Sequence, residues 1–510
     1  MEECLDSELT IGSHALVIGG SMAGLLASRV LAARFERVTI VERDRFPGGP
    51  APRKGVPQAS HQHIMLRRGT DILERLFPGI RGELVASGAP LLDMANDAVW
   101  LTPFGWGVCF PSDLIMLTCS RDLLEWGVRR RVAALPKVRF LERVEVTGLF
   151  PAADGADHVG GVKIRFRGGE RSKEEEILRA GLVVDASGRS SRAPRWLKAL
   201  GYEPPQESVI DAHLGYSSRI YRLPKGFDPG WKGAYVQLAP PEHMRGGALL
   251  PIEGDRWLLT LAGTGGDYPP TNEKGFLAFA RSLRTSIFYD ALEDAEPLSE
   301  ISGYRATENR IRRYEELFRQ PHNFVVVGDA TCAFNPVYGQ GMTVAALGAE
   351  ALEESLSEQH REESDGDLGW LSRRFQKRYA KVNAAAWKMA TAQDLRVPGM
   401  IGGSPGLMER LVGRYMDKVV ELSTESERVR LTLLEAMNML EPPSTLFAPA
   451  VALRVLRRAL VRRDKAGDGP RGASTGGSAT PLGERSEASK VFVGTHPTTQ
   501  HRRLYRAPGR

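Results

Sequence analysis

Residues 19–24, Gly-Gly-Ser-Met-Ala-Gly, form a glycine-rich turn that follows an apolar run and precedes a run of small and apolar residues. A dinucleotide fingerprint has this form. Glycine allows the tight turn, a small residue lets the backbone approach the pyrophosphate, and a further glycine lets a helix pack closely on a strand. Ser21 stands where the middle glycine is usual. We therefore predict a pyrophosphate site at a helix N-terminus, where free N–H groups favour an anion, formed by Gly19, Gly20, Ser21, Ala23 and Gly24.

Glu42 lies 18 residues after Gly24, at the end of the next apolar run. A carboxylate at this distance accepts hydrogen bonds from ribose hydroxyls, and it repels a 2′-phosphate, which argues against NADP in this site. Arg43 follows directly, and we expect it to stack near the adenine edge. A strand, a helix and a second strand are predicted over residues 14–42, and they provide the context that a lone glycine motif lacks.

A second glycine-containing turn lies about three hundred residues later in the chain, in the stretch VVVGDATCAFNPVYGQGMT. Gly328 and Asp329 end its apolar strand, so the carboxylate is expected at the carboxyl edge of a parallel sheet, where such sheets bind ligands. A carboxylate there binds a polyol hydroxyl. Pro336, Gly339 and Gly341 then allow the backbone to approach a flat ligand. The helix that begins near Gly341 directs its positive end at that ligand, which in a flavin stabilises negative charge in the reduced state.

The remaining chain supplies the elements that position these turns. Short alternating strands over residues 208–268 interrupt the nucleotide-binding pattern, and residues 341–464 are mostly helical. The predicted fold class is α/β, a Rossmann-like domain with an inserted, mainly antiparallel β-sheet and a helical C-terminal region. The expected divisions are the nucleotide-binding domain at 12–205 and 301–365, the inserted substrate domain at 206–300, the helical region at 366–464 and a disordered basic tail at 465–510.

The chain resembles the FAD-dependent monooxygenases of the p-hydroxybenzoate hydroxylase type, and within them the squalene-epoxidase-like and polyether-epoxidase-like branch. The motifs GGSMAGL, the ER after the second strand, DASGRSSR and GDATCAFNPVYGQGM match that family in order and spacing over roughly residues 12–400. The resemblance implies an FAD-binding domain, with Asp329 on the ribitol and Gly339 to Met342 over the pyrimidine edge of the flavin. It further implies cofactor roles for Arg121 near the pyrophosphate, for the backbone of Val144 near adenine, and for Asp185.

The family reduces FAD with NAD(P)H, adds O₂ to flavin C4a and transfers oxygen from the resulting hydroperoxide. The resemblance thus implies a hydroxylase or an epoxidase. The sequence contains no second dinucleotide fingerprint, which suits a transient NAD(P)H. The inserted strands carry many apolar side chains, and these favour a lipophilic, secondary-metabolite-like substrate. They are Tyr216, Tyr221, Tyr235, Leu249, Leu250, Trp257, Leu259 and Leu261.

Other reactions stay open. The DASG form at Asp185 departs from the usual DG form of the family, and it also occurs in flavin-dependent alkene reductases of the geranylgeranyl-reductase type. A non-catalytic flavin-binding redox protein is a further alternative. A flavin-dependent halogenase is disfavoured, because the spacing of Trp100 and Trp106 does not give a WxWxIP motif.

The catalytic side chains are not identified, and His61 and His63 are the weak candidates. With Gln58 they lie on a loop that in this family runs from the ribose towards the flavin ring. No Cys or Asp with suitable spacing accompanies them, so no metal site is predicted. Asp394 and Pro398 are expected near the mouth of the substrate pocket.

The charge of the chain is uneven. From Arg454 onward there are 13 Lys and Arg and 4 Asp and Glu, while the whole chain has a net charge of +6, so the body is slightly acidic. Nucleic-acid binding by the body is therefore not expected. The helix LFAPAVALRVLRRALVRR is basic and amphipathic, and it either lies on an anionic membrane or packs on the body.

The 4 cysteines fit neither a disulfide framework nor a zinc site, and the N-terminus lacks secretory-signal features, so we expect a cytoplasmic protein. No oligomeric state follows from the sequence.

Overall fold

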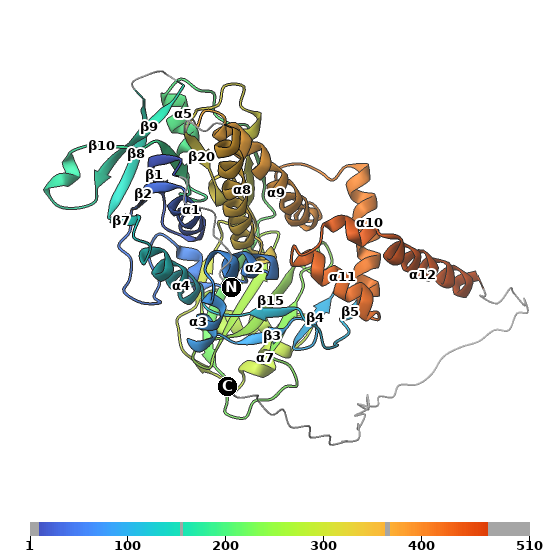
Figure 1. Ribbon diagram of the computed structural model, residues 1–510. Coiled ribbons are helices and arrows are strands. Elements are labelled where there is room, and N and C mark those ends of the chain that lie inside the picture. The colour runs from blue at the N-terminus through green and yellow to red at the C-terminus, as the bar shows by residue number, and fades with distance from the viewer. Residues whose placement is uncertain (1–9, 153–156, 363–367, 468–510) are drawn as a thin grey trace, which may run out of the picture. The chain divides into compact units, whose positions relative to one another are not determined.

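The computed structural model describes residues 10–152, 157–362 and 368–467 (Figure 1). Residues up to Arg458 form one compact unit. Nearly all of the predicted disordered tail, 465–510, lies outside the described residues. Among those that are described, no helix combines the length and the apolar character needed to cross a membrane.

A five-stranded parallel sheet with the order β20-β11-β1-β2-β7 forms the centre of the nucleotide-binding part. Its strands are β1 (Gly12–Ile18), β2 (Phe35–Glu42), β7 (Val138–Glu142), β11 (Leu182–Asp185) and β20 (Phe324–Val326). Ala15, Leu16 and Val17 of β1 are fully buried, as expected for a strand with both sheet faces covered. The pairing of β11 with β20 joins chain segments from before and after the inserted domain.

Helices cover one face of this sheet, and a small antiparallel sheet covers the other. The helices are α1 (Met22–Ala32), α4 (Arg121–Ala133) and α8 (Gly341–Glu362), with α2 (Arg67–Leu76) and α3 (Ile80–Ala86) beside them. The small sheet consists of β8 (Val144–Pro151), β9 (Val159–Phe166) and β10 (Glu176–Arg179). The predicted start of α4 is confirmed, because the Ser120 hydroxyl accepts a hydrogen bond from the N–H of Leu123 at 3.1 Å.

The inserted domain is an eight-stranded sheet with the main order β17-β13-β16-β15-β14-β4-β5, and β18 pairs with β13. Its predicted strands are β13 (Gly215–Arg222), β14 (Gly233–Val236), β15 (Arg245–Ile252) and β16 (Arg256–Gly263), with the short β17 (Glu296–Pro297) and β18 (Ser302–Tyr304). Helices α6 (Glu273–Arg281) and α7 (Ile287–Leu292) cover one face.

Three strands of this sheet come from outside the predicted insertion, 206–300: β18 lies just after its end, and two others lie far before its start. β4 (Ala98–Thr102) pairs in parallel with β14, so that Trp100 lies opposite Tyr235, and β5 (Gly105–Trp106) continues the sheet. Sequence reasoning missed them, because residues 98–106 are short and their pairing is long-range. The first part of the chain therefore also builds the substrate side.

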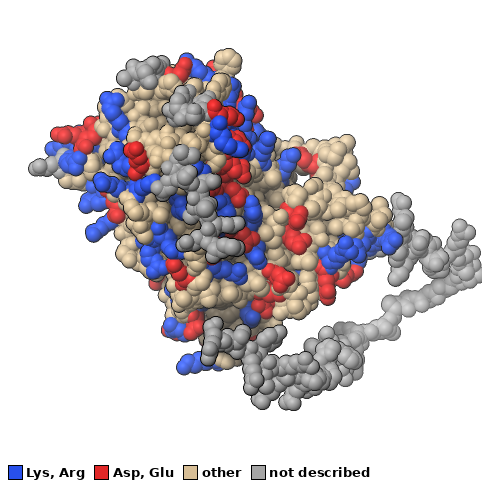
Figure 2. All heavy atoms as spheres, in the orientation of Figure 1, with Lys and Arg blue, Asp and Glu red and all other residues tan. Residues whose placement is uncertain are grey.

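The remaining elements connect these bodies. They are β3 (Leu91–Asp93), β6 (Ile115–Leu117), β12 (Glu207–Ile210), β19 (Asn309–Arg312), β21 (Cys332–Ala333) and α5 (Ala193–Ala199). The C-terminal helices are α9 (Leu371–Asp394), α10 (Leu407–Leu422), α11 (Glu427–Met437) and α12 (Pro449–Gly467). α9 runs beside α8 (Figure 1), and α11 packs with Trp100 in one apolar cluster. Positive and negative side chains are interspersed over the face shown in Figure 2.

Tyr379 on α9 connects the two helices to the second glycine turn. Its side chain is fully buried, and its hydroxyl accepts a hydrogen bond from the N–H of Gly328 at 3.1 Å and donates one to the carbonyl of Val344 at 3.3 Å.

We expect Tyr379→Phe to lower the free energy of unfolding by about 1–3 kcal/mol, because both backbone groups lose their partner in a buried place. Chemical denaturation of the full chain measures this change. Tyr289→Phe is the matched control, since Tyr289 is half-exposed, and we expect its effect to stay within about 0.5 kcal/mol. Equal effects of the two exchanges would contradict the role of Tyr379.

Candidate active site

Three sequence motifs meet at the carboxyl edge of the parallel sheet through backbone contacts that leave no room for side chains. A Cβ on Gly24 would lie 1.9 Å from the carbonyl oxygen of Gly19, and one on Gly19, whose φ is +99°, would lie 2.6 Å from the carbonyl oxygen of Ala186. Gly328 has a φ of +63°, and a Cβ on it would lie 2.7 Å from the Cβ of Ala23. The structure therefore brings the first turn, the DASG turn and the second turn together.

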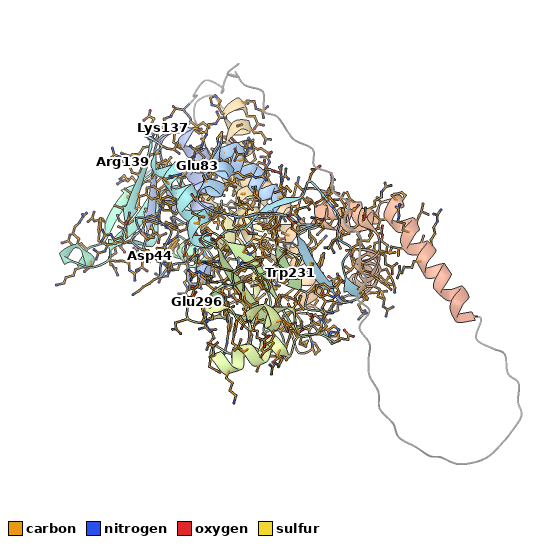
Figure 3. All side chains as sticks on the ribbon, turned by 90° about the horizontal axis from the view of Figure 1, so that it is seen from below. Asp44, Glu83, Lys137, Arg139, Trp231 and Glu296 are labelled. Atoms are coloured by element: carbon orange, nitrogen blue, oxygen red, sulfur yellow. The ribbon has the colours of Figure 1, made fainter. Side chains whose placement is uncertain are left out.

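Glu42 lies beside the first turn and is buried. Its Oε2 accepts a hydrogen bond from the N–H of Gly20 at 2.8 Å, and its Oε1 accepts one from the N–H of Asp44 at 3.0 Å. Arg53 forms an ion pair with the same carboxylate at 3.3 Å and with Asp44 (Figure 3) at 3.5 Å. Sequence reasoning predicted Glu42 here but missed Arg53, whose loop carries no motif. Arg43 is exposed just beyond β2.

Arg121 opens α4 under the same turn. Its Nη2 donates to Ser21 Oγ at 2.9 Å and to Glu125 Oε2 at 2.7 Å, and Arg53 pairs with the other oxygen of Glu125 at 2.8 Å. Burial raises the pKa of Glu125, but Arg121 and Arg53 outweigh it and the pKa is lowered, so the carboxylate is ionised. The Ser21 hydroxyl donates to Glu125 at 2.8 Å, whereas the sequence suggested that it donates to phosphate.

A pocket opens beside these groups, lined by Pro47, Gly49, Ala51, Arg53, Val56, Ala59, Arg121, Asp122, Glu125, Trp126 and Arg129. The Nη1 atom of Arg121 is buried and has no hydrogen-bond partner among the described residues. A buried guanidinium nitrogen without an acceptor fits a phosphate oxygen, which forms charge-assisted hydrogen bonds with arginine. Together with the N-terminus of α1, this part of the site fits a pyrophosphate.

Asp329 stands at the start of the second turn and faces the first residue of α8. Its Oδ1 lies 3.8 Å from the position of a Cβ on Gly341. No donor within the described residues is hydrogen-bonded to this carboxylate, which leaves it available to a ligand hydroxyl. Burial raises the pKa of Asp329, and Arg189 and Arg121 oppose that rise. These features fit the predicted contact with a ribitol chain.

The backbone after Asp329 forms the flavin-side loop, Pro336–Gly341, and hydrogen bonds to the side chain of Asp394 hold this loop in place. Gly339 has a φ of +65°, as a tight turn requires of glycine. The buried carboxylate of Asp394 accepts hydrogen bonds from Tyr338 Oη at 2.7 Å and from Asn335 Nδ2 at 3.0 Å, and it accepts a third from Asn309 at 2.6 Å. The expected place of Asp394 near the pocket mouth is therefore wrong. This carboxylate is 3% exposed and supports the loop.

Met342 and Pro336 complete the predicted set on this side, with Met342 partly buried against the main core. Gln340, between the two glycines, has a buried Oε1 without a hydrogen-bond partner among the described residues. Sequence reasoning did not single it out, because one glutamine between glycines carries no pattern.

The remaining predicted residues lie around the same edge. Val144 is buried at the start of β8. The carboxylate of Asp185 accepts hydrogen bonds from the N–H of Ser187 at 2.9 Å and from Ser191 Oγ at 2.5 Å, so it shapes its own turn. Arg189 donates to the carbonyl of Phe334 at 2.9 Å and thereby joins that turn to the segment just before the flavin-side loop.

His61 and His63 both face the interior of the site, and both are neutral near pH 7. His61 Nδ1 lies 2.8 Å from Ser218 Oγ, its ring meets that of Tyr216 edge-on at 4.5 Å, and burial lowers its pKa to about 4. His63 Nδ1 donates to the carbonyl of His61 at 2.9 Å, and burial lowers its pKa to about 3, helped by Arg121. The described residues contain no cluster of three or more potential metal ligands.

The inserted sheet presents only part of its predicted apolar set to the site. Tyr221, Leu249, Leu259 and Leu261 pack with α6 and α7 on the opposite face, and Trp257 packs against them. Sequence alternation shows that side chains divide between two faces, but it does not show which face meets the flavin-side loop. Tyr216 lies on the site side, where it joins Leu214, Leu238, Ala262, Tyr304 and Val337 in one apolar cluster.

Comparisons with known proteins found relatives in sequence and neighbours in fold. No family model matches the sequence. Protein Rv3254 of Mycobacterium tuberculosis is 35% identical over 387 residues, which are 75% of this chain and 80% of the relative. Ubiquinone hydroxylase UbiL of Rhodospirillum rubrum is 24% identical over 354 residues, 68% of this chain and 72% of the relative.

Solved structures share the fold at low sequence identity. The flavin-dependent brominase Bmp2 superposes with a TM-score of 0.61 and 14% identity over 89% of this chain and 100% of that one. The p-nitrophenol 4-monooxygenase PnpA from Pseudomonas putida DLL-E4 gives a TM-score of 0.57 and 16% identity over 84% of this chain and 98% of that one. The predicted fold class is thereby confirmed.

We expect Arg121→Met to weaken FAD binding by about 10- to 100-fold, because a hydrogen bond to a charged group contributes roughly 1.5–3 kcal/mol. Titration of the apoprotein with FAD measures this. Arg130→Met is the matched control, since Arg130 lies exposed on the same helix. Unchanged affinity in the Arg121 variant would remove this residue from the cofactor site.

His63 makes stability depend on pH. Its pKa in the folded state is about 3, below the ordinary 6.5, so the unfolded chain takes up the proton first. Its contribution is complete above about pH 6.5 and is lost as the pH falls from there towards about 3. We expect His63→Gln to flatten the fall of the melting temperature over this range. His360→Gln makes the same exchange on α8, and an equal flattening there would contradict the assignment.

Proposed function

We propose that this chain is an FAD-dependent monooxygenase of the p-hydroxybenzoate hydroxylase type, which inserts one atom of O₂ into a lipophilic substrate as a hydroxylase or an epoxidase. The observation that carries the proposal is the meeting of the three motifs at one sheet edge, beside the apolar cluster around Tyr216. The Arg121 nitrogen without a partner and the open carboxylate of Asp329 lie on the cofactor side of that edge.

FAD, when bound, supplies the redox chemistry that activates O₂. Glu42 would hold the ribose, and the N-terminus of α1 with Arg121 would hold the pyrophosphate. Asp329 would bind the ribitol, and the residues from Gly339 to Met342 would lie against the pyrimidine edge. There the N-terminus of α8 stabilises negative charge. The Asp394 hydrogen bonds keep this loop in one conformation, so its N–H groups need no rearrangement during the reaction.

On the substrate side, the chain excludes water and charge. The apolar cluster around Tyr216 and Tyr304 lies between the inserted sheet and the flavin-side loop. His61 borders it as a neutral ring tied to Ser218, which in turn is hydrogen-bonded to Thr260 at 2.7 Å. A dry, uncharged surface suits a lipophilic substrate, and it protects a reactive cofactor from water. His61 thus borders this apolar cluster without adding charge to it.

NAD(P)H is proposed as a transient reductant, because the sequence holds one dinucleotide fingerprint and Glu42 occupies the ribose side of that site. An alkene reductase of the geranylgeranyl-reductase type remains the second candidate, favoured by the DASG form of the turn at Asp185. The two reactions differ in the fate of O₂, as does a non-catalytic flavin-binding redox protein.

Peripheral membrane contact through α12 is also proposed for this enzyme, together with a cytoplasmic location. Leu453 and Leu456 are 53% and 59% exposed beside the basic Arg454 and Arg457. Such a face suits an anionic lipid surface. Vesicles of phosphatidylserine should retain the full chain and release a chain truncated at Phe447. Equal retention would remove α12 from the contact.

We expect turnover with NAD(P)H under isotopically labelled O₂ to place one labelled oxygen atom in a lipophilic alkene or aromatic product, detected by mass spectrometry. The matched control is the same reaction with labelled water and ordinary O₂, which should leave the product unlabelled. A saturated product without label would replace the proposal by the reductase. Substrate-independent oxidation of NAD(P)H with every compound tried would favour the non-catalytic redox protein.

A further inference from the structure

Glu253 lies in the turn between β15 and β16 of the inserted sheet, and its carboxylate reaches the start of α4 in the nucleotide-binding part. Its Oε2 accepts a hydrogen bond from the N–H of Ser120 at 2.9 Å, and its Oε1 accepts one from the hydroxyl of the same serine at 2.6 Å. The side chain of Glu253 is 12% exposed. Both oxygens of one largely buried carboxylate thus hold the residue that precedes α4.

These contacts complete the cap of α4 from a distant part of the chain. In a capping box, the N-cap side chain accepts the N–H three residues later, and a Glu or Gln at that later position accepts the N–H of the N-cap residue. Ser120 Oγ accepts the N–H of Leu123 at 3.1 Å, but Leu123 cannot return the contact, because its side chain is apolar and buried in the main core. Glu253, 133 residues away from Ser120, accepts that N–H instead.

The turn that carries Glu253 is itself fixed on several sides. Gly254 and Asp255 have positive φ angles of +75° and +54°, as tight hairpin turns often require. Arg256 donates to Glu253 Oε1 at 2.7 Å and to the Glu253 carbonyl at 2.9 Å, so it holds both the side chain and the backbone. Gly88 adjoins the same turn, since a Cβ there would lie 3.5 Å from the Cβ of Glu253.

The helix start that Glu253 holds carries the arginine of the cofactor site. Arg121 follows Ser120 directly, and its buried Nη1 atom has no hydrogen-bond partner among the described residues. Ser21 and Glu125 hold its Nη2 atom. Those two contacts orient the end of the side chain, whereas the position of its Cα depends on where α4 begins. Glu253 fixes that position, and its negative charge at the helix N-terminus adds to the stability of the arrangement.

We propose that Glu253 is a positioning residue for the cofactor, which completes the cap of α4 from the inserted domain and so holds Arg121 in place for the pyrophosphate of FAD. Glu253 is not among the residues that would touch FAD, and it acts through Ser120 and Arg121. The inserted domain, which is proposed to carry the substrate, thereby contributes to the retention of the cofactor. This inference rests on the proposed function, because it concerns the cofactor site of that function.

The test titrates the full-length apoprotein with FAD and follows the quenching of flavin fluorescence. We expect Glu253→Ala to weaken FAD binding by about tenfold, because the hydrogen bonds that fix the start of α4 are lost. Glu253→Gln keeps the size of the side chain and one oxygen acceptor, and we expect it to weaken FAD binding by about fivefold. The same two exchanges at Glu296 (Figure 3) are the matched control. Glu296 is also paired with an arginine of the inserted sheet, Arg222, at 2.6 Å, but it is exposed, and its exchange should leave the affinity unchanged.

A double-mutant cycle separates the positioning of Arg121 from a general loss of structure. Because Glu253 acts through Arg121, either exchange at Glu253 should change the FAD affinity of the Arg121→Met variant by less than about twofold. A residue that only supports the fold would weaken FAD binding by the same factor with Arg121 present and with Arg121 replaced. Equal factors in the two backgrounds would therefore overturn the proposal.

Unchanged FAD affinity in both Glu253 variants would also overturn it. The titration does not depend on turnover, so it is independent of the test of the reaction. Incorporation of labelled oxygen by the wild type, together with unchanged FAD affinity in the Glu253 variants, would refute the positioning role alone. A loss of affinity that depends on Arg121, in a protein that incorporates no labelled oxygen, would refute the monooxygenase and retain the role of Glu253.

Discussion

The close approach of glycine backbones at the carboxyl edge of the parallel sheet is the constraint on which the rest of the structure depends. Gly24 touches Gly19, Gly19 touches the carbonyl of Ala186, and Gly328 touches Ala23. Any side chain at these glycines would push the three turns apart. Because they stay in contact, the N–H groups of the first turn, the carboxylate of Asp329 and the start of α8 lie at the same edge of the sheet, where the proposed cofactor would bind.

Charge in this protein is organised by burial. Around the first turn, Arg53, Glu42, Glu125 and Arg121 neutralise one another while Arg121 keeps one nitrogen without a partner. Such a network orients the arginines, and it leaves the Arg121 nitrogen available to the phosphate of the proposed cofactor.

The proposed substrate side is lined by neutral and apolar side chains instead of a network of charges. His61 is kept neutral by burial, and the rings of Tyr216 and Tyr304 stack with centres 5.5 Å apart. The flavin-side loop above them is held by Asp394 from α9, a helix that contributes no predicted motif. A rigid loop over an apolar wall is suited to positioning a lipophilic molecule while the reaction is shielded from water. The C-terminal helices thus take part in the site from outside its motifs.

The sequence by itself determined the cofactor half of this protein. The two glycine turns, Glu42, Asp329 and the start of α4 at Arg121 are local signals, because tight turns and helix starts depend on neighbouring residues. Only the tertiary structure decided the rest. It added β4 to the inserted sheet, turned Leu249, Leu259 and Leu261 away from the site, and placed Asp394 beneath the flavin-side loop. Such long-range pairings have no periodic signal, because they arise when distant segments pack together.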